Sequence, residues 1–378
     1  MLAAGSLALA LGGCSAMPTE VRGTFVGSRR VDVTIAVPPG HESEHERYVY
    51  AALTTLKILG AWLPPFEDST LAVTPEGTAW WSAPAAMSPE YAVARAVSRR
   101  YWERAIDTRE LPPWFVDGLV EYCARRAVSK IVDERYQAVY RSRVEQRYFG
   151  GFVPRELRVP LRVEDEGDPV GEYRARPRGT DARALEAKAL LALGTLEQWV
   201  GRAVFDEIVA EFAREPGRPS LGSFASLANR ISGQNLTWFF EQTFESPGVI
   251  DYGITAMSSE EQPDGWFKTT VTVQRFGDGI FSGAQGGRGV VAETTFADAQ
   301  TIRDTWDGRS STTTFQYRSQ SRAVSAEVDP DRVVLLDLNR GNNGVTLDPG
   351  PARTAASRWS ARWMIWLEDA LLTYVAFT

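Results

Sequence analysis

Both histidines of the chain lie in one short segment whose spacing matches a zinc-binding motif. His41 and His45 enclose Glu42 in the pattern His-Glu-x-x-His. On a helix, two histidines four residues apart point the same way and can bind zinc, while the glutamate acts as a general base. This segment, however, directly follows a Pro-Pro-Gly turn, and its intervening positions are polar. We therefore expect an exposed, acidic helix start, with an adventitious metal site as the alternative.

A second segment, residues 93–122, has the layout of a zinc site without its ligands. A working site of this layout carries His-Glu-x-x-His on one helix and a Glu-Gly pair on the next helix, about nineteen residues later. When the segment is aligned on its Tyr-Trp pair, the two histidine positions hold Arg95 and Arg99, and the general-base position holds Ala96. Asp117, before a glycine, is the one acceptor left at a ligand position.

Guanidinium groups at these positions oppose a metal ion. Arginine does not release its proton and only donates hydrogen bonds. A divalent ion about 4 Å from one guanidinium meets repulsion of about 8 kcal/mol at an effective dielectric of about 20. Because one aspartate cannot offset two arginines, we predict no catalytic residue, no metal and no cofactor. We expect Arg95 or Arg99 to pair with Asp117 and so to link the two helices.

Further segments extend the likeness beyond this motif. The chain resembles the aminopeptidase N-type gluzincin metallopeptidases over roughly residues 30–348, with matching segments at residues 184–191, 200–205, 232–242 and 247–252. The resemblance implies an α+β fold, in which a mainly helical thermolysin-like domain with a small N-terminal sheet precedes an immunoglobulin-like β-sandwich. It also places Glu186 where the family has its transition-state tyrosine. The replaced positions together indicate a degenerate, inactive member of the family.

The chain divides into four expected parts. These are a signal or lipobox segment at residues 1–14, a metallopeptidase-like domain at 19–250, a β-sandwich at 251–349 and an amphipathic helix at 350–378. Hydrophobic periodicity predicts helices at residues 43–60, 88–106, 113–128, 133–147, 180–199, 202–214, 223–231 and 235–244. Alternation predicts strands at residues 31–37, 70–74, 268–274, 289–296, 312–317, 323–328 and 333–338.

The two ends of the chain carry features typical of membrane attachment. Cys14 ends a Leu-Gly-Gly-Cys segment after a short apolar run, which resembles a bacterial lipobox; an uncleaved apolar tail is the alternative. Aromatic residues fall on one stripe of the C-terminal helix, and they are Trp359, Trp363, Trp366, Tyr374 and Phe377. Such a stripe suits a membrane interface or a groove on a partner, or it docks on the protein's own core.

Composition and motifs together favour a structural role. A net charge of −7 gives no sign of nucleic-acid binding. We expect a non-catalytic scaffold subunit of a membrane-associated assembly on the periplasmic side of a bacterial membrane. Its expected partners are other protein subunits and the membrane surface, which it contacts through the Cys14 lipid and the C-terminal helix. The alternatives are a module that binds peptides or anionic ligands in the vestigial cleft, and a residual zinc aminopeptidase-like hydrolase that uses His41 and His45.

Overall fold

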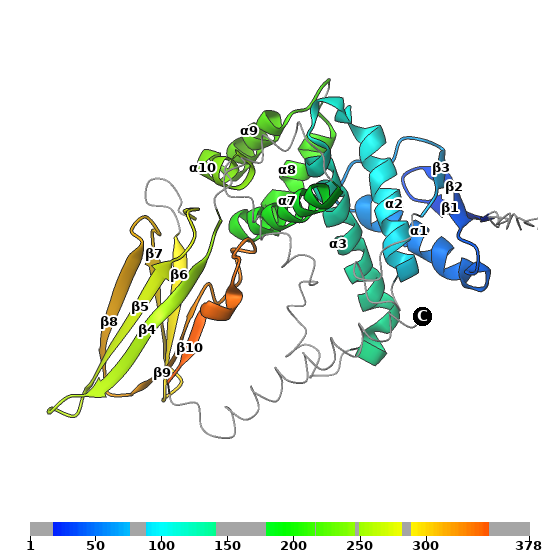
Figure 1. The fold of residues 1–378 in the computed structure, drawn as a ribbon. Coiled ribbons are helices and arrows are strands. Elements are labelled where there is room, and N and C mark those ends of the chain that lie inside the picture. Colours follow the sequence, from blue (N-terminus) through cyan, green and yellow to red (C-terminus); the bar gives the residue numbers. More distant parts are fainter. Residues whose placement is uncertain are drawn as a thin grey trace, which may run out of the picture. The chain divides into compact units, whose positions relative to one another are not determined.

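The computed structural model describes residues 18–75, 88–140, 179–215, 217–245, 249–281 and 289–347. The chain separates into two compact units, Met1–Gln234 and Asn235–Thr378 (Figure 1). The first unit is a small sheet with helices, and the second is mainly β-structure, so the α+β class holds. Within the described residues, no helix combines the length and the apolar character needed to cross a bilayer.

The N-terminal sheet has the strand order β1-β2-β3. Its strands are β1 (Thr19–Val26), β2 (Arg30–Val37) and β3 (Thr70–Val73). β1 and β2 form an antiparallel hairpin, and β3 pairs with β2 in parallel. Strict alternation buries every second residue of β2, as the sequence predicts. The strand β1 was not predicted, because it lies at the sheet edge and its inward positions are only half-buried.

The helices that follow build the core of the first unit. They are α1 (His45–Leu59), α2 (Ser88–Ala105), α3 (Pro113–Tyr140), α7 (Gly179–Val200), α8 (Arg202–Ala213) and α9 (Leu221–Ser232). α3 contacts α1, α2 and α7, and is therefore central. Aromatic side chains fill the space around it through edge-to-face contacts, among them Phe115, Phe212 and Phe224.

The prediction of two helices, at residues 113–128 and 133–147, is wrong in one respect. α3 runs without a break from Pro113 to Tyr140. The linking residues contain no proline or glycine, and Ile131 lies one turn after the buried Ala127 and is itself fully buried. The apolar stripe therefore continues across the expected gap, and no breaker ends the helix there.

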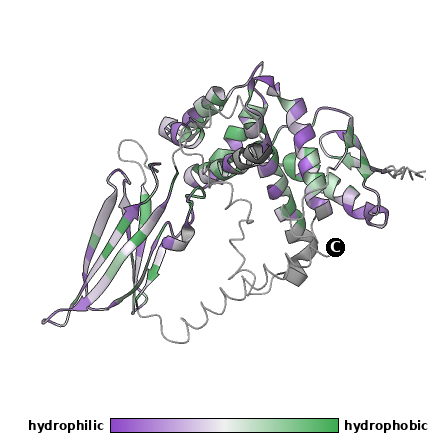
Figure 2. Cartoon of the chain, in the orientation of Figure 1, coloured by the Kyte–Doolittle hydropathy of each residue, from purple (hydrophilic) through white to green (hydrophobic). Residues whose placement is uncertain are grey.

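The second unit begins with a short helix and continues as two sheets. α10 (Thr237–Phe240) leads into a π-helical turn at Glu241–Glu245. The sheets have the orders β4-β5-β8 and β10-β9-β6-β7. The strands are β4 (Tyr252–Glu261), β5 (Phe267–Arg275), β6 (Val290–Phe296), β7 (Thr301–Trp306), β8 (Thr312–Ser319), β9 (Ala323–Val328) and β10 (Gly344–Thr346). Hydrophilic and hydrophobic residues alternate along them (Figure 2).

The second compact unit begins at Asn235 and so includes α10. Trp238 of α10 packs edge-on against Phe281, with ring centroids 5.2 Å apart. The predicted strand at residues 333–338 is wrong: this segment forms turns and a single bridge. The Asp329 carboxylate accepts the backbone N–H groups of Val333 and Val334, at 2.8 and 2.9 Å, which removes them from any ladder.

Candidate functional site

Helix α2 presents both arginines of the predicted ligand positions to helix α3. Arg99 Nη2 lies 2.7 Å from Asp117 Oδ1, and Arg95 Nε lies 3.5 Å from Glu121 Oε2. The two arginines are four residues apart on α2, and the two carboxylates are four residues apart on α3, so each helix presents its two residues on one face. We call these four residues the arginine ladder. The expected link between Asp117 and one of the two arginines is therefore present, through Arg99.

Glu121 is the most buried member of the arginine ladder. Its side chain is 5% exposed, and it receives further contacts from two neighbours. Arg125 Nε donates to Glu121 Oε1 at 2.6 Å, and the Tyr91 hydroxyl donates to the same oxygen. Burial, together with the charge of Glu121, raises the pKa of Tyr91 well above its usual range. Glu121 was not predicted as a site residue from the sequence, because no motif marks its position and only packing brings it to Arg95, Arg125 and Tyr91.

A second buried carboxylate ties α1 to α2 beside the arginine ladder. The Glu90 side chain is fully buried and accepts a forked pair of bonds from Arg47 of α1, at 2.9 and 2.7 Å. Bidentate guanidinium–carboxylate pairs are strong and fix geometry. Arg47 also pairs with Glu44, near the start of the same helix. The charged groups around α2 thus serve as cross-links between helices.

The residues at the predicted ligand positions do not fit a zinc ion. Arg95 and Arg99 offer only N–H groups. Asp117 already accepts a hydrogen bond from Arg99, and Glu121 already forms an ion pair with Arg95. Ala96 carries no group that could accept a proton. A zinc site needs several nitrogen, sulfur or oxygen donors around one point. Within the described ranges, no group of three or more histidine, cysteine, aspartate or glutamate side chains could hold a metal ion.

The literal His-Glu-x-x-His segment is an exposed helix start, as predicted. His41 precedes a 3₁₀ turn at Glu42–Glu44, and His45 is the first residue of α1. His41 Nδ1 lies 2.7 Å from Glu44 Oε2, and this hydrogen bond is the main cause that lowers the pKa of Glu44. His45 Nδ1 instead lies 3.1 Å from the backbone oxygen of Glu42. His41 therefore lies outside the helix that His45 begins.

Helix α7 approaches the arginine ladder closely at Gly118, the residue after Asp117. A Cβ atom at Gly118 would lie 2.5 Å from the Cβ of Ala189, so only glycine permits this helix contact. Lys188 precedes Ala189, and burial lowers its pKa to about 8. The side chain of Glu186, also in α7, lies outside the described residues. So do Cys14 and the aromatic stripe of residues 359–377.

The chain is similar in structure to a solved aminopeptidase. Aminopeptidase A of Legionella pneumophila, in a crystal structure with aspartic acid, matches with a TM-score of 0.53 at 12% sequence identity. The match covers 85% of this chain but 38% of that protein, so the chain spans well under half of its length. No model of a protein family and no curated protein matches the sequence. The likeness supports a peptidase-like fold.

Proposed function

We propose that this chain is a non-catalytic relative of the zinc metallopeptidases, of the aminopeptidase N-type gluzincin kind. The observation that carries the proposal is the arginine ladder. In such an enzyme, α2 and α3 would be joined by ligands to a shared metal ion; here guanidinium–carboxylate pairs join them. The position of the general base holds a methyl group, at Ala96. The elements that would position a catalytic site therefore persist while the chemical groups are replaced.

Electrostatics favours the same view. A zinc ion near the arginine ladder would have to displace Arg99 from Asp117 and Arg95 from Glu121, and both cations would remain beside it. At about 4 Å and an effective dielectric of about 20, each guanidinium would repel the ion by about 8 kcal/mol, which offsets the attraction of the two freed carboxylates and leaves no net gain. Proton transfer from an attacking water would also lack an acceptor, since both nearby carboxylates are already paired with arginines.

The proposed role is that of a scaffold subunit on the periplasmic side of a bacterial membrane. Two sequence features support it: the lipobox-like segment that ends at Cys14, and the aromatic stripe of the C-terminal segment. A lipid on Cys14 would hold the chain at the membrane, and the stripe would add a second contact, since stable attachment commonly combines two signals. The β-sandwich and the helical unit then offer surfaces for other subunits.

The loss of catalysis is tested by metal content and hydrolysis. The full chain is incubated with zinc, exchanged into metal-free buffer, and measured by elemental analysis and with aminoacyl and peptide reporters. We expect substoichiometric zinc and no hydrolysis above buffer. Stoichiometric zinc that is lost in an Asp117→Asn variant, together with hydrolysis, would overturn the proposal. Zinc lost instead in a His41→Ala variant would indicate a site at the helix start.

The scaffold role is tested separately, by gentle detergent extraction and identification of co-purifying chains. We expect the same subunits to co-purify at fixed ratios from membranes. Recovery of a lone monomer from the soluble fraction would contradict the scaffold role and leave the conclusion about catalysis intact.

A further inference from the structure

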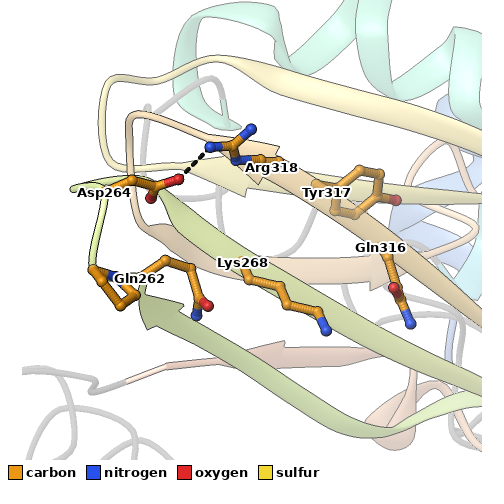
Figure 3. A pocket seen from close by; sticks show the side chains of 7 residues that line it. Gln262, Asp264, Lys268, Gln316, Tyr317 and Arg318 are labelled. Atoms are coloured by element: carbon orange, nitrogen blue, oxygen red, sulfur yellow. Dashed lines mark hydrogen bonds and ion pairs between the residues drawn. The ribbon is translucent and has the colours of Figure 1, made fainter.

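The second unit contains a pocket on the outer face of the sheet β4-β5-β8, at the turn between β4 and β5. Its volume is about 460 Å³, and it is lined by Gln262, Pro263, Asp264, Lys268, Gln316, Tyr317 and Arg318 (Figure 3). All of these residues belong to one compact unit and come from the hairpin turn, from β5 and from β8. The pocket is therefore independent of the arginine ladder.

Strand register places the polar side chains of the pocket together. Lys268 of β5 lies opposite Arg318 of β8, and Thr270 lies opposite Gln316. Because alternate residues point to the same face, Lys268, Gln316 and Arg318 share the exposed face of the sheet. Figure 3 shows Lys268 and Gln316 extending on the same side of the strands.

The hairpin turn that forms one wall is held by its own hydrogen bonds. Gln262 N–H donates to the Trp266 carbonyl at 2.7 Å, and Trp266 N–H donates to Asp264 Oδ1 at 3.1 Å. Gly265 takes a φ of +78°, a conformation that favours glycine. Asp264 and Gln262 are therefore held in place before any ligand arrives.

The charges of the pocket do not cancel. Asp264 accepts from Arg318 Nη2, and the Arg318 guanidinium also lies over the Trp266 ring, 5.0 Å from its centroid. That pair is neutral. Lys268 makes no ion pair with any described residue, and Gln316 makes no side-chain hydrogen bond with any of them. Glu260 of β4 lies opposite Lys268 in the strand register. Its carboxylate forms no ion pair with Lys268, and Glu260 does not line the pocket.

We propose that this pocket binds a small ligand that carries an oxyanion, either a carboxylate or a phosphate group. Lys268 supplies the opposing charge. The remaining N–H groups of Arg318 and the amide of Gln316 supply further donors. The volume exceeds that of one oxyanion, and the Gln262 and Gln316 carboxamides both donate and accept, so the rest of the ligand is polar and uncharged.

The test uses the full chain and records backbone amide shifts by NMR. Inorganic phosphate, acetate and glucose are titrated separately. We expect saturable shifts at residues 262–268 and 316–318 with phosphate or acetate but not with glucose. Lys268→Gln should weaken that binding roughly tenfold, the scale of one hydrogen bond to a charged group. Lys57→Gln, which removes an exposed lysine in the other unit, is the matched control and should leave the affinity unchanged.

The outcomes separate the two ligand classes. Saturation by phosphate alone assigns a phosphate ester, and saturation by acetate alone assigns a carboxylate. The proposal is overturned if neither anion saturates, if glucose binds equally well, or if Lys57→Gln weakens binding as much as Lys268→Gln does. Because Lys268 is exposed, its variant should fold, and an otherwise unchanged spectrum checks this.

Discussion

At the scale of single residues, arginine and histidine differ in a way that decides what α2 can do. A neutral imidazole offers a lone pair to a metal ion, whereas a guanidinium offers only donors and keeps its charge. With Arg95 and Arg99 in place, the carboxylates of α3 are the natural partners. The same helix pair that could share an ion therefore shares hydrogen bonds. Arg99 and Asp117 are partly exposed, at 36% and 28% of their side chains, so solvent weakens their attraction.

The contribution of the Arg99–Asp117 pair can be measured directly. Asp117→Asn should lower the free energy of unfolding by about 1 kcal/mol, the upper range for a partly exposed pair. Glu103→Gln, which breaks the more exposed pair with Arg100, is the control and should change little. Urea unfolding of Asp117→Asn, Arg99→Gln and the double variant of these two residues gives the coupling energy. No coupling would mean that the pair does not link the helices.

Lys188 gives a prediction of pH dependence. Burial lowers its pKa from 10.5 to about 8, so between these values the unfolded chain binds more protons than the folded chain. Stability contributed by this residue therefore rises with pH across that window, and the full penalty is present below it. Lys188→Met should stabilise the protein by about 3 kcal/mol at neutral pH, and the gain should shrink toward pH 10.5.

Thermal unfolding of wild type and Lys188→Met at several pH values checks this, because the difference isolates Lys188 from other titrating groups. A gain in stability that does not depend on pH would contradict a lowered pKa for Lys188 in the folded protein. Lys57→Met, at an exposed position, should show no such gain.

At the scale of elements, α3 can pack closely against α7 because Gly118 has no side chain. Gly118 lets the two helices approach where Asp117, one residue earlier, meets Arg99. The same residue thus sets the distance between helices and the placement of the arginine ladder. Cores have little room for added atoms, and overpacking forces neighbours to move.

Gly118→Ala should therefore destabilise the protein by about 1–3 kcal/mol, although alanine is the better helix former. Gly222→Ala in α9 is the matched control, since its nearest neighbour would lie at an ordinary 3.6 Å. That change should be neutral or stabilising. Chemical unfolding of both variants tests the contrast, and equal effects would show that the α3–α7 contact adapts. Adding Ala189→Gly should restore part of the loss.

The sequence could predict elements where one local rule decides the structure. Alternation located β2, and apolar periodicity located α2 and α8. The Arg99–Asp117 pair could be predicted from the sequence, because a known motif layout brings those two positions together. The contacts of Glu121 with Arg125 and Tyr91 could not be predicted, because these residues belong to no motif and only the packing of the helices brings them together. The predicted strand at residues 333–338 was wrong for a related reason. A strongly apolar run is typical of a strand, but here the Asp329 carboxylate accepts hydrogen bonds from the backbone N–H groups of Val333 and Val334.

At the scale of the whole molecule, the two compact units divide the proposed tasks. The first unit carries the arginine ladder, and the second unit, with its two sheets, carries the proposed oxyanion pocket. The proposed membrane attachment rests on the chain ends, which lie outside the described residues. The likeness to the Legionella aminopeptidase extends over 85% of this chain, and the likeness therefore reaches both units.

Membrane attachment gives a prediction at this scale. In bacterial cells, Cys14→Ala should move the protein from the membrane fraction to the soluble fraction, because the acyl anchor is lost. Cys123→Ala is the matched control and should stay with the membrane, since Cys123 is fully buried in the core of the helical unit. Fractionation followed by blotting measures both. Equal distribution of the Cys14 variant and the wild type would exclude lipid attachment at this residue.

A helix pair joined by guanidinium–carboxylate pairs responds to different solution conditions from a helix pair joined by a metal ion. A protein whose helices are joined by a metal ion loses stability when a chelator removes the ion, and added sodium chloride changes its stability little. Here the Arg99–Asp117 contact is partly open to water, so mobile counterions weaken it as the Debye length shortens. EDTA should therefore leave the contact between α2 and α3 unchanged, whereas concentrated salt should weaken it.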